Sequence, residues 1–99
     1  MARLHIHLQE GFGGEDVAVT VDGEERLRRD DVRTRRVLGL AFHDAFEVAD
    51  GPHIVKVSIP ARGIEKAIDV DALGDVYVGL GLSGDDLRVR VTGTRFGYG

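Results

Sequence analysis

The stretch Ala45–Ile59, AFEVADGPHIVKVSI, constrains the fold more than any other part of this chain. Apolar side chains recur at every second position before and after Asp50-Gly51-Pro52, in which Gly51 can adopt a positive φ. Two alternating runs around such a turn predict a β-hairpin. Because an isolated hairpin is marginally stable in water, the rest of the chain must supply strands that cover its apolar face.

Alternating runs of the same kind predict further strands. They lie at Arg3–Gln9, Val17–Val21, Ala67–Val70, Val76–Leu82 and Leu87–Val91. Turn sequences separate them, including Asp22-Gly23 and Pro60–Gly63. About seven strands, with a turn every roughly 8–12 residues, predict an all-β fold, an antiparallel immunoglobulin-like β-sandwich. The predicted core is Leu4, Ile6, Leu8, Val17, Val19, Val21, Phe46, Val48, Val55, Val57, Ile59, Val76, Val78 and Leu80.

Length and composition indicate a single domain over residues 1–99, because 99 residues can bury one core but not two. Cysteine is absent, which excludes disulfides and cysteine-ligated zinc. The formal charge of −4 argues against a polyanion-binding domain. No stretch reaches the roughly 20 apolar residues of a membrane-spanning helix. The start also lacks the apolar segment of a signal peptide, so we expect cytoplasmic localisation if Met1 is the native start.

Residues 26–44 are the one polarised segment, and we predict an arginine-rich insertion there and a loose tail at residues 94–99. The arginines predicted to contact a protein partner are Arg26, Arg28, Arg29, Arg33, Arg35 and Arg36. Nucleic acid is disfavoured because no aromatic residue is interleaved for base stacking and the rest of the chain is acidic. The alternative interpretation is an edge segment whose charges prevent pairing between copies. Uncovered edge strands elsewhere could instead join copies into a homo-oligomer.

Three pieces of the chain, in order, resemble a known family: VTVDGE (Val19–Glu24), DGPHIVKVSIPARGI (Asp50–Ile64) and AIDVDALGDVYVGLGL (Ala67–Leu82). With a G-x-H-x-V-x-V spacing that begins at Gly51, they are similar to PEGA-type domains and, more broadly, to transthyretin-like and carboxypeptidase-regulatory-like β-sandwiches. The resemblance implies a transthyretin-like sandwich with an accessory binding role and no catalytic residues. It also implies that His53 packs at the mouth of the hairpin. Residues 26–44 and the added strand at residues 87–91 depart from the family pattern.

His5 and His7 are the candidate metal ligands, since residues two apart on a strand point to the same face. Neutral imidazoles placed in this way could hold Zn²⁺ or Cu²⁺ with a third ligand from a neighbouring strand. The alternative is a pair of polar side chains on a solvated face. The acidic loops at residues 10–16 and 85–86 could hold Ca²⁺ weakly, whereas the residues after Asp69 lack the spacing of a calcium loop.

A further hypothesis, a hydrolase, would require a pocket that gathers His43 or His53 with carboxylates. His43 and Asp44 are adjacent, and neighbouring residues of an extended chain face opposite ways. Neither serine of the chain, Ser58 or Ser83, lies in a nucleophile motif. The sequence therefore predicts a non-enzymatic binding or accessory module that mediates protein–protein contact and needs no cofactor. The alternative function is a metal-binding β-sandwich protein that uses the strand histidines.

Overall fold

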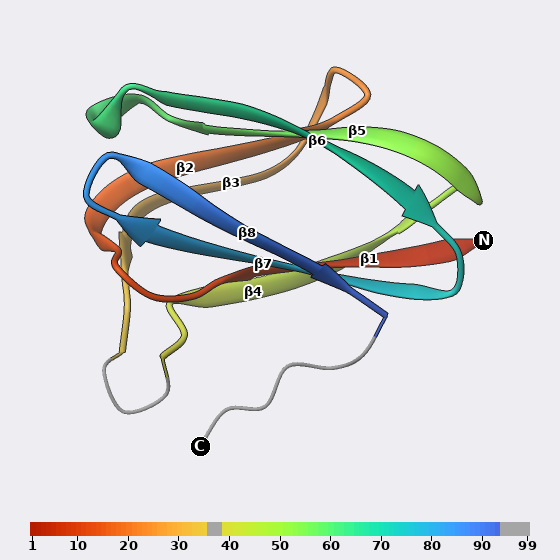
Figure 1. Ribbon diagram of the computed structural model, residues 1–99, viewed down its shortest axis with the longest axis horizontal. Coiled ribbons are helices and arrows are strands. Elements are labelled where there is room, and N and C mark those ends of the chain that lie inside the picture. Colours follow the sequence, from red (N-terminus) through yellow and green to blue (C-terminus); the bar gives the residue numbers. More distant parts are fainter. Residues whose placement is uncertain (36–38, 94–99) are drawn as a thin grey trace.

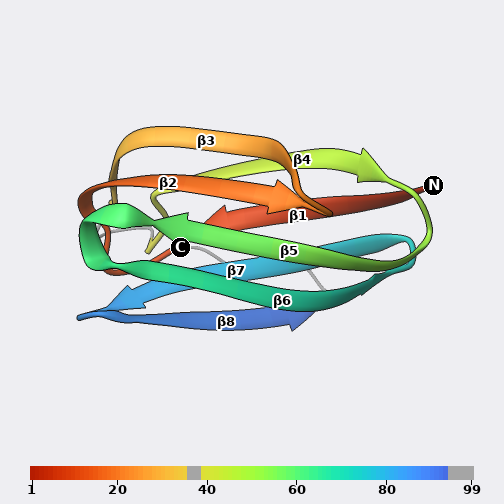
Figure 2. The ribbon, with the colours of Figure 1, turned by 90° about the horizontal axis from the view of Figure 1, so that it is seen from above.

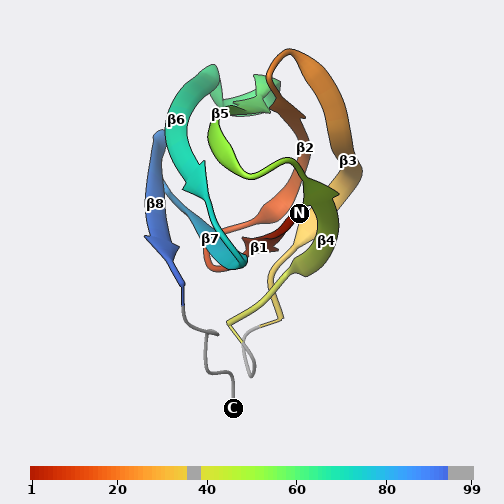
Figure 3. The same ribbon diagram turned by 90° about the vertical axis from the view of Figure 1, so that its right-hand side faces the viewer.

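The part of the chain described by the computed structural model, residues 1–35 and 39–93, is all-β. Its elements are β1 (Ala2–Leu8), β2 (Gly13–Val21), β3 (Glu24–Arg33), β4 (Phe42–Val48), β5 (Gly51–Ile59), the 3₁₀ helix η1 (Pro60–Arg62), β6 (Ile64–Ala72), β7 (Asp75–Ser83) and β8 (Asp86–Thr92). The strands form two four-stranded sheets, in the orders β4-β1-β7-β8 and β3-β2-β5-β6 (Figure 1). The two sheets face each other, which confirms a β-sandwich, with eight strands instead of about seven (Figure 3). Within the described residues, no helix has the length and apolar character needed to cross a membrane.

The alternating patterns place one face of each sheet in a shared core. β1 buries every second residue from Ala2 to Leu8, and β5 buries Val55, Val57 and Ile59 from the opposite sheet. Every predicted core residue except Phe46 is buried, and Phe46 packs half-buried against the edge of the core. Burial of each such aliphatic side chain contributes roughly 1.5–3 kcal/mol, so this core supplies the main driving force for folding.

Strand pairing is antiparallel except between β1 and β7. β1 lies in the middle of its sheet, antiparallel to β4 on one side and parallel to β7 on the other. Parallel neighbours require a long crossover, and here the five strands from β2 to β6 provide it (Figure 2). The first strand is therefore held in place by the last quarter of the chain.

The hairpin predicted at Ala45–Ile59 is wrong. β4 pairs with β1 in one sheet, whereas β5 pairs with β2 and β6 in the other. The two residues between them, Ala49 and Asp50, carry the chain from one layer to the other (Figure 3). Alternation predicts which side chains of a strand are buried but not which strand is its neighbour. Both runs bury their apolar faces in the same core from opposite sides.

Two predicted turns are confirmed. Asp22 and Gly23 have φ values of 52° and 85°, as a type I′ turn requires, and they join β2 to β3. Pro60 begins η1, and Gly63 follows it with φ of 64° before β6. The loop predicted at residues 10–16 is wrong in its second half, because β2 already begins at Gly13.

The segment predicted as an arginine-rich insertion, residues 26–44, supplies most of β3 and the start of β4. Leu27 and Val32 are buried and hold β3 against the core. Register shifts interrupt its pairing with β2, and Asp31 has a positive φ of 54°. Irregular edge strands pair poorly with a further strand, so this edge is protected against pairing with another chain. The tail predicted at residues 94–99 lies outside the described residues.

Candidate binding surfaces

Two of the predicted partner-binding arginines close one side of the sandwich, where the edge strands β3 and β4 meet. The guanidinium carbon of Arg26 lies 4.6 Å from the ring centroid of Phe46, and Arg26 Nη2 donates to the carbonyl oxygen of Glu47 at 3.1 Å. The guanidinium carbon of Arg29 lies 4.3 Å from the ring centroid of Phe42. Such cation–π contacts hold the two sheets together at their edges.

Arg28 and Arg33, also on β3, point to solvent and pair with acidic residues of the same strand. Arg28 Nε lies 3.2 Å from Glu25, and Arg33 Nη2 lies 3.0 Å from Asp31. Their side chains are 66% and 67% exposed, so both remain accessible to a partner. The backbone of Arg35 bridges to Leu40, and Arg36 lies outside the described residues.

We expect Arg26→Ala and Arg29→Ala each to lower the free energy of unfolding by about 1 kcal/mol, because each removes a cation–π contact and uncovers a phenylalanine. Arg28→Ala and Arg33→Ala are matched controls on the same strand. Their effect should stay within about 0.5 kcal/mol, since exposed ion pairs contribute little. Urea denaturation of the four variants measures the difference. Equal losses in both pairs of variants would contradict the structural role of Arg26 and Arg29.

His5 and His7 share the outer face of β1 with aromatic neighbours. The ring of His5 stacks on Tyr77 at a centroid distance of 4.2 Å, and its Nε2 lies 3.0 Å from Asp75 Oδ1. The ring of His7 stacks on His43 of β4 at 5.3 Å. Partial burial, followed by the proximity of His43 and His5, lowers the pKa of His7 to about 4. His7 is therefore neutral at pH 7.

Among residues 1–35 and 39–93, no three histidine and acidic side chains are grouped so that they could hold a metal ion. The prediction that His5 and His7 bind Zn²⁺ or Cu²⁺ thus gains no third ligand from this part of the chain. It stays a prediction, and titration calorimetry with either ion tests it. The side chains of His43 and Asp44, which the sequence predicts not to meet, have separate partners. Asp44 Oδ1 accepts from the backbone N–H of Ala45 at 2.8 Å, and the ring of His43 stacks on His7.

A surface groove of about 510 Å³ lies where β5 begins and β6 ends. Its lining residues are Asp22, Pro52, His53, Ile54, Asp69, Val70 and Asp71. Ile54 is 53% exposed, although most large aliphatic side chains of the described residues are buried. Sequence reasoning missed this site. The available signal was an isoleucine at an outward position of an otherwise regular alternation.

His53 joins three parts of the chain beside the groove. Its Nε2 lies 2.6 Å from the carbonyl oxygen of Ala49, and its Nδ1 lies 2.6 Å from Asp22 Oδ2. A carbonyl oxygen only accepts, so Nε2 donates, and Nδ1 donates as well when the ring is charged. The hydrogen bond to Ala49 and the one to Asp22 raise the pKa of His53 above 6.5. The N–H of Ile54, and then His53, lower the pKa of Asp22 below 3.8.

These shifts predict a pH-dependent contribution of His53 to stability. Because its folded pKa is raised, the contribution is complete below pH 6.5 and is lost as the pH rises through the folded pKa. At the acid end it is lost as Asp22 protonates, below pH 3.8. We expect the difference in melting temperature between the wild type and His53→Gln to be largest between pH 3.8 and pH 6.5 and to shrink as the pH rises through the raised folded pKa of His53. A difference that does not change with pH would contradict a charged His53.

No protein-family model, curated protein or solved structure matches this chain. Function must therefore be argued from the surfaces themselves. Two of them offer accessible groups to a partner: the groove beside Ile54 and the outward arginines of β3.

Proposed function

We propose that this protein is a non-enzymatic module that binds a protein partner through the groove at the start of β5. The observation that carries the proposal is Ile54, which is 53% exposed on the lining of the groove beside Pro52. Together the two side chains form an apolar spot on a largely polar outer face. Covering the exposed half of an isoleucine contributes about 1 kcal/mol to binding. A partner that fills the groove gains this energy together with polar contacts at the rim.

We also propose that the sandwich belongs to the transthyretin-like class and not to the immunoglobulin-like one. In constant-type immunoglobulin domains the first two strands share a sheet. Here β1 and β2 belong to different sheets, and β1 pairs with β4 and β7. Of the two classes that the sequence indicates, this strand order supports the transthyretin-like one. The accessory role that the resemblance implies agrees with a binding function.

The outward side of β3 is the second candidate contact surface. Its support is the exposure of Arg28 and Arg33, each about two-thirds accessible. An acidic partner would displace the modest pairing with Glu25 and Asp31. Charge reversal of both arginines to glutamate should then reduce capture of that partner and leave capture through the groove unchanged.

Homo-oligomerisation through edge strands remains part of the proposal. β6 and β8 are edge strands whose pairing with their neighbours runs without register shifts, unlike that of β3. Regular edges are better templates for another strand. Size-exclusion chromatography with light scattering over a range of protein concentrations tests this.

Site-specific cross-linking tests the proposed function. A photo-reactive amino acid in place of Ile54 should cross-link a defined partner in a lysate of the source organism. The matched control places the same amino acid at Val91, which is 45% exposed and lies in the other sheet. The proposal requires a product from position 54 that position 91 does not give. Identical products from both positions, or none from position 54, would overturn it.

A further inference from the structure

We infer that the segment bound in this groove is an extended, basic peptide. The aliphatic stem of one of its lysine or arginine side chains covers Ile54, and the cationic head lies between Asp69 and Asp71. The inference rests on the proposed function and specifies the chemistry of the partner. It follows from the arrangement of apolar and acidic groups on the outer face of the β3-β2-β5-β6 sheet.

Ile54 has a carboxylate on each side. In the register of β5 and β6 it faces Asp69, and on the β2 side its N–H donates to Asp22 Oδ1 at 2.9 Å. Two pairs further along, Pro52 faces Asp71. Asp69 and Asp71 are two residues apart on β6, so they point to the same face, roughly 7 Å apart along the strand. An apolar floor between carboxylates matches a side chain with an apolar stem and a cationic tip.

The carboxylates of Asp69 and Asp71 are available to such a tip. Asp22 is already occupied, since it accepts from the N–H of Ile54 and pairs with His53. In contrast, no ion pair or side-chain hydrogen bond joins Asp69 or Asp71 to another residue among those that the structure describes. Their charge is therefore not neutralised within the described chain. A guanidinium or ammonium group would neutralise these carboxylates and donate charge-assisted hydrogen bonds to them.

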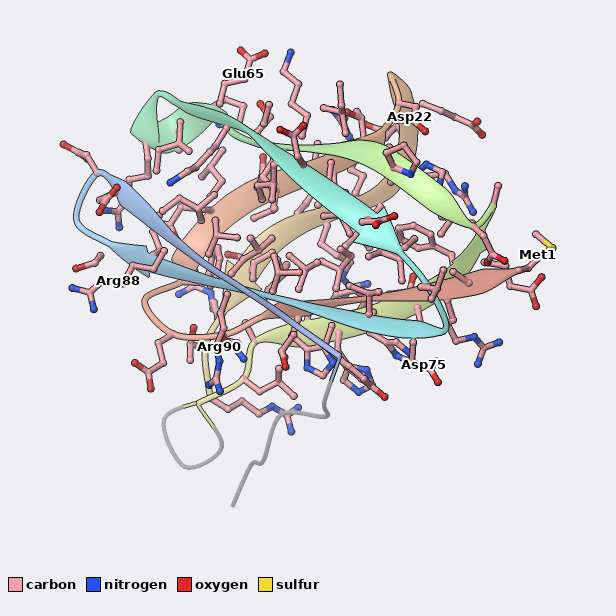
Figure 4. The ribbon with its side chains drawn as sticks, turned by 45° about the vertical axis from the view of Figure 1, so that its right-hand side comes forward. Met1, Asp22, Glu65, Asp75, Arg88 and Arg90 are labelled. Carbon is pink, nitrogen blue, oxygen red and sulfur yellow. The ribbon has the colours of Figure 1, made fainter. Side chains whose placement is uncertain are left out.

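The lining of the groove is acidic, since it contains Asp22, Asp69 and Asp71 and no lysine or arginine. Figure 4 shows Asp22 and Glu65 on the side of the β3-β2-β5-β6 sheet, and Arg88 and Arg90, together with Asp75, on the side of the other sheet. An acidic or phosphorylated segment would be repelled at the groove, whereas a basic one is attracted. This complementarity favours a basic peptide over an acidic one.

A bare divalent cation fits the groove less well than a peptide. Calcium takes six to eight oxygen ligands, and no group of three or more acids or histidines is arranged to hold a metal within residues 1–35 and 39–93. A cation alone would also leave Ile54 and Pro52 uncovered. A basic side chain contacts both parts of the lining, because its stem covers the apolar residues and its cationic head meets the carboxylates.

Fluorescence anisotropy with a labelled heptapeptide of alternating arginine and leucine tests the inference on the full chain. The reference probe is the same peptide with glutamate in place of arginine. We expect binding of the arginine peptide only, with a dissociation constant below about 1 mM. Asp69→Asn/Asp71→Asn should raise that constant about tenfold, because charge-assisted hydrogen bonds are lost. Asp85→Asn/Asp86→Asn removes the same charge at the junction of β7 and β8 and should change the dissociation constant less than about twofold.

Ile54→Ser supplies the second measurement, because an exposed position tolerates it without unfolding. It should also weaken binding of the arginine peptide, which general charge attraction would not explain. Equal binding of both probes, no binding at about 1 mM, or equal weakening by the two double asparagine variants would overturn the inference.

If the arginine peptide does not bind while position 54 still cross-links a partner, only the inferred chemistry of the partner is wrong. If neither binds, the proposed function fails as well. Self-association of the chain in light scattering that Ile54→Ser abolishes would identify a second copy of this chain as the occupant.

Discussion

Replacing Gly11 with alanine should destabilise this protein by about 3 kcal/mol or more. Gly11 follows β1 and has φ of 88°, a conformation in which a side chain is strained. A Cβ at this position would lie 1.7 Å from the carbonyl oxygen of Leu82 in β7. The approach cannot relax easily, because Leu82 N donates to the carbonyl oxygen of Glu10 at 2.7 Å. The substitution therefore forces β1 and β7 apart where the parallel pair ends.

Gly13→Ala is the matched control for this substitution. Gly13 lies two residues further on, has no positive φ, and has no atom within 4 Å of the position of an added Cβ. Its replacement should change the free energy of unfolding by less than about 1 kcal/mol. Thermal unfolding separates the two outcomes, since 1 kcal/mol shifts the melting temperature of a domain of this size by about 4–8 °C. Similar melting temperatures for both variants would show that the close approach at Gly11 is not rigid.

The faces of the strands could be predicted from the sequence because period-2 alternation is a local property. The apolar residues of β1, from Leu4 to Leu8, are buried as the pattern indicates. The turn at Asp22-Gly23 is also local, since the positive φ values of its two residues depend on their own chemistry. Each of these predictions needs only neighbouring residues.

Strand pairing could not be predicted in the same way, because it depends on residues far apart. Nothing local distinguishes a turn that reverses the chain within one sheet from a link that crosses to the other, as Ala49 and Asp50 do. The roles of Arg26 and Arg29 were hidden for the same reason. Their partners, Phe46 and Phe42, belong to a strand of the other sheet.

In the sequence, the only sign of the candidate groove is an apolar residue at a position where the alternating pattern predicts a polar one. Ile54 occupies an outward position next to Val55, and its carboxylate neighbours come from the β2–β3 turn and from β6. Only the register of three strands brings Asp22, Ile54 and Asp69 into one row. His53 illustrates the same limit, because the resemblance implied a packing role and the structure adds its hydrogen bonds to Asp22 and Ala49.

Replacing Arg62 with methionine should lower the free energy of unfolding by about 2 kcal/mol at neutral pH. Its Nε and Nη2 donate to Oε2 of Glu15 at 3.0 and 2.8 Å, and its Nη1 donates to the carbonyl oxygen of Gly84 at 2.6 Å. Glu15 is buried, 8% exposed, and would be left with the N–H of Gly13 as its remaining side-chain contact from another described residue. Breaking a fully buried pair costs about 3–5 kcal/mol. The figure here is smaller because the Arg62 side chain is 31% exposed and solvent screens it.

The pH dependence of this loss distinguishes an uncompensated charge from lost packing. Burial raises the pKa of Glu15, but the N–H of Gly13 and the guanidinium of Arg62 outweigh it, so the pKa lies below 4.5. The stabilisation is present above pH 4.5 and is lost as the pH falls through the lowered folded pKa. Urea denaturation should therefore show a deficit of Arg62→Met that is largest at neutral pH and shrinks in acid. The double variant Glu15→Gln/Arg62→Met, which buries no charge, should be more stable at neutral pH than Arg62→Met alone. A double variant as unstable as the single one would assign the loss to the stem of Arg62 and its contact with Gly84.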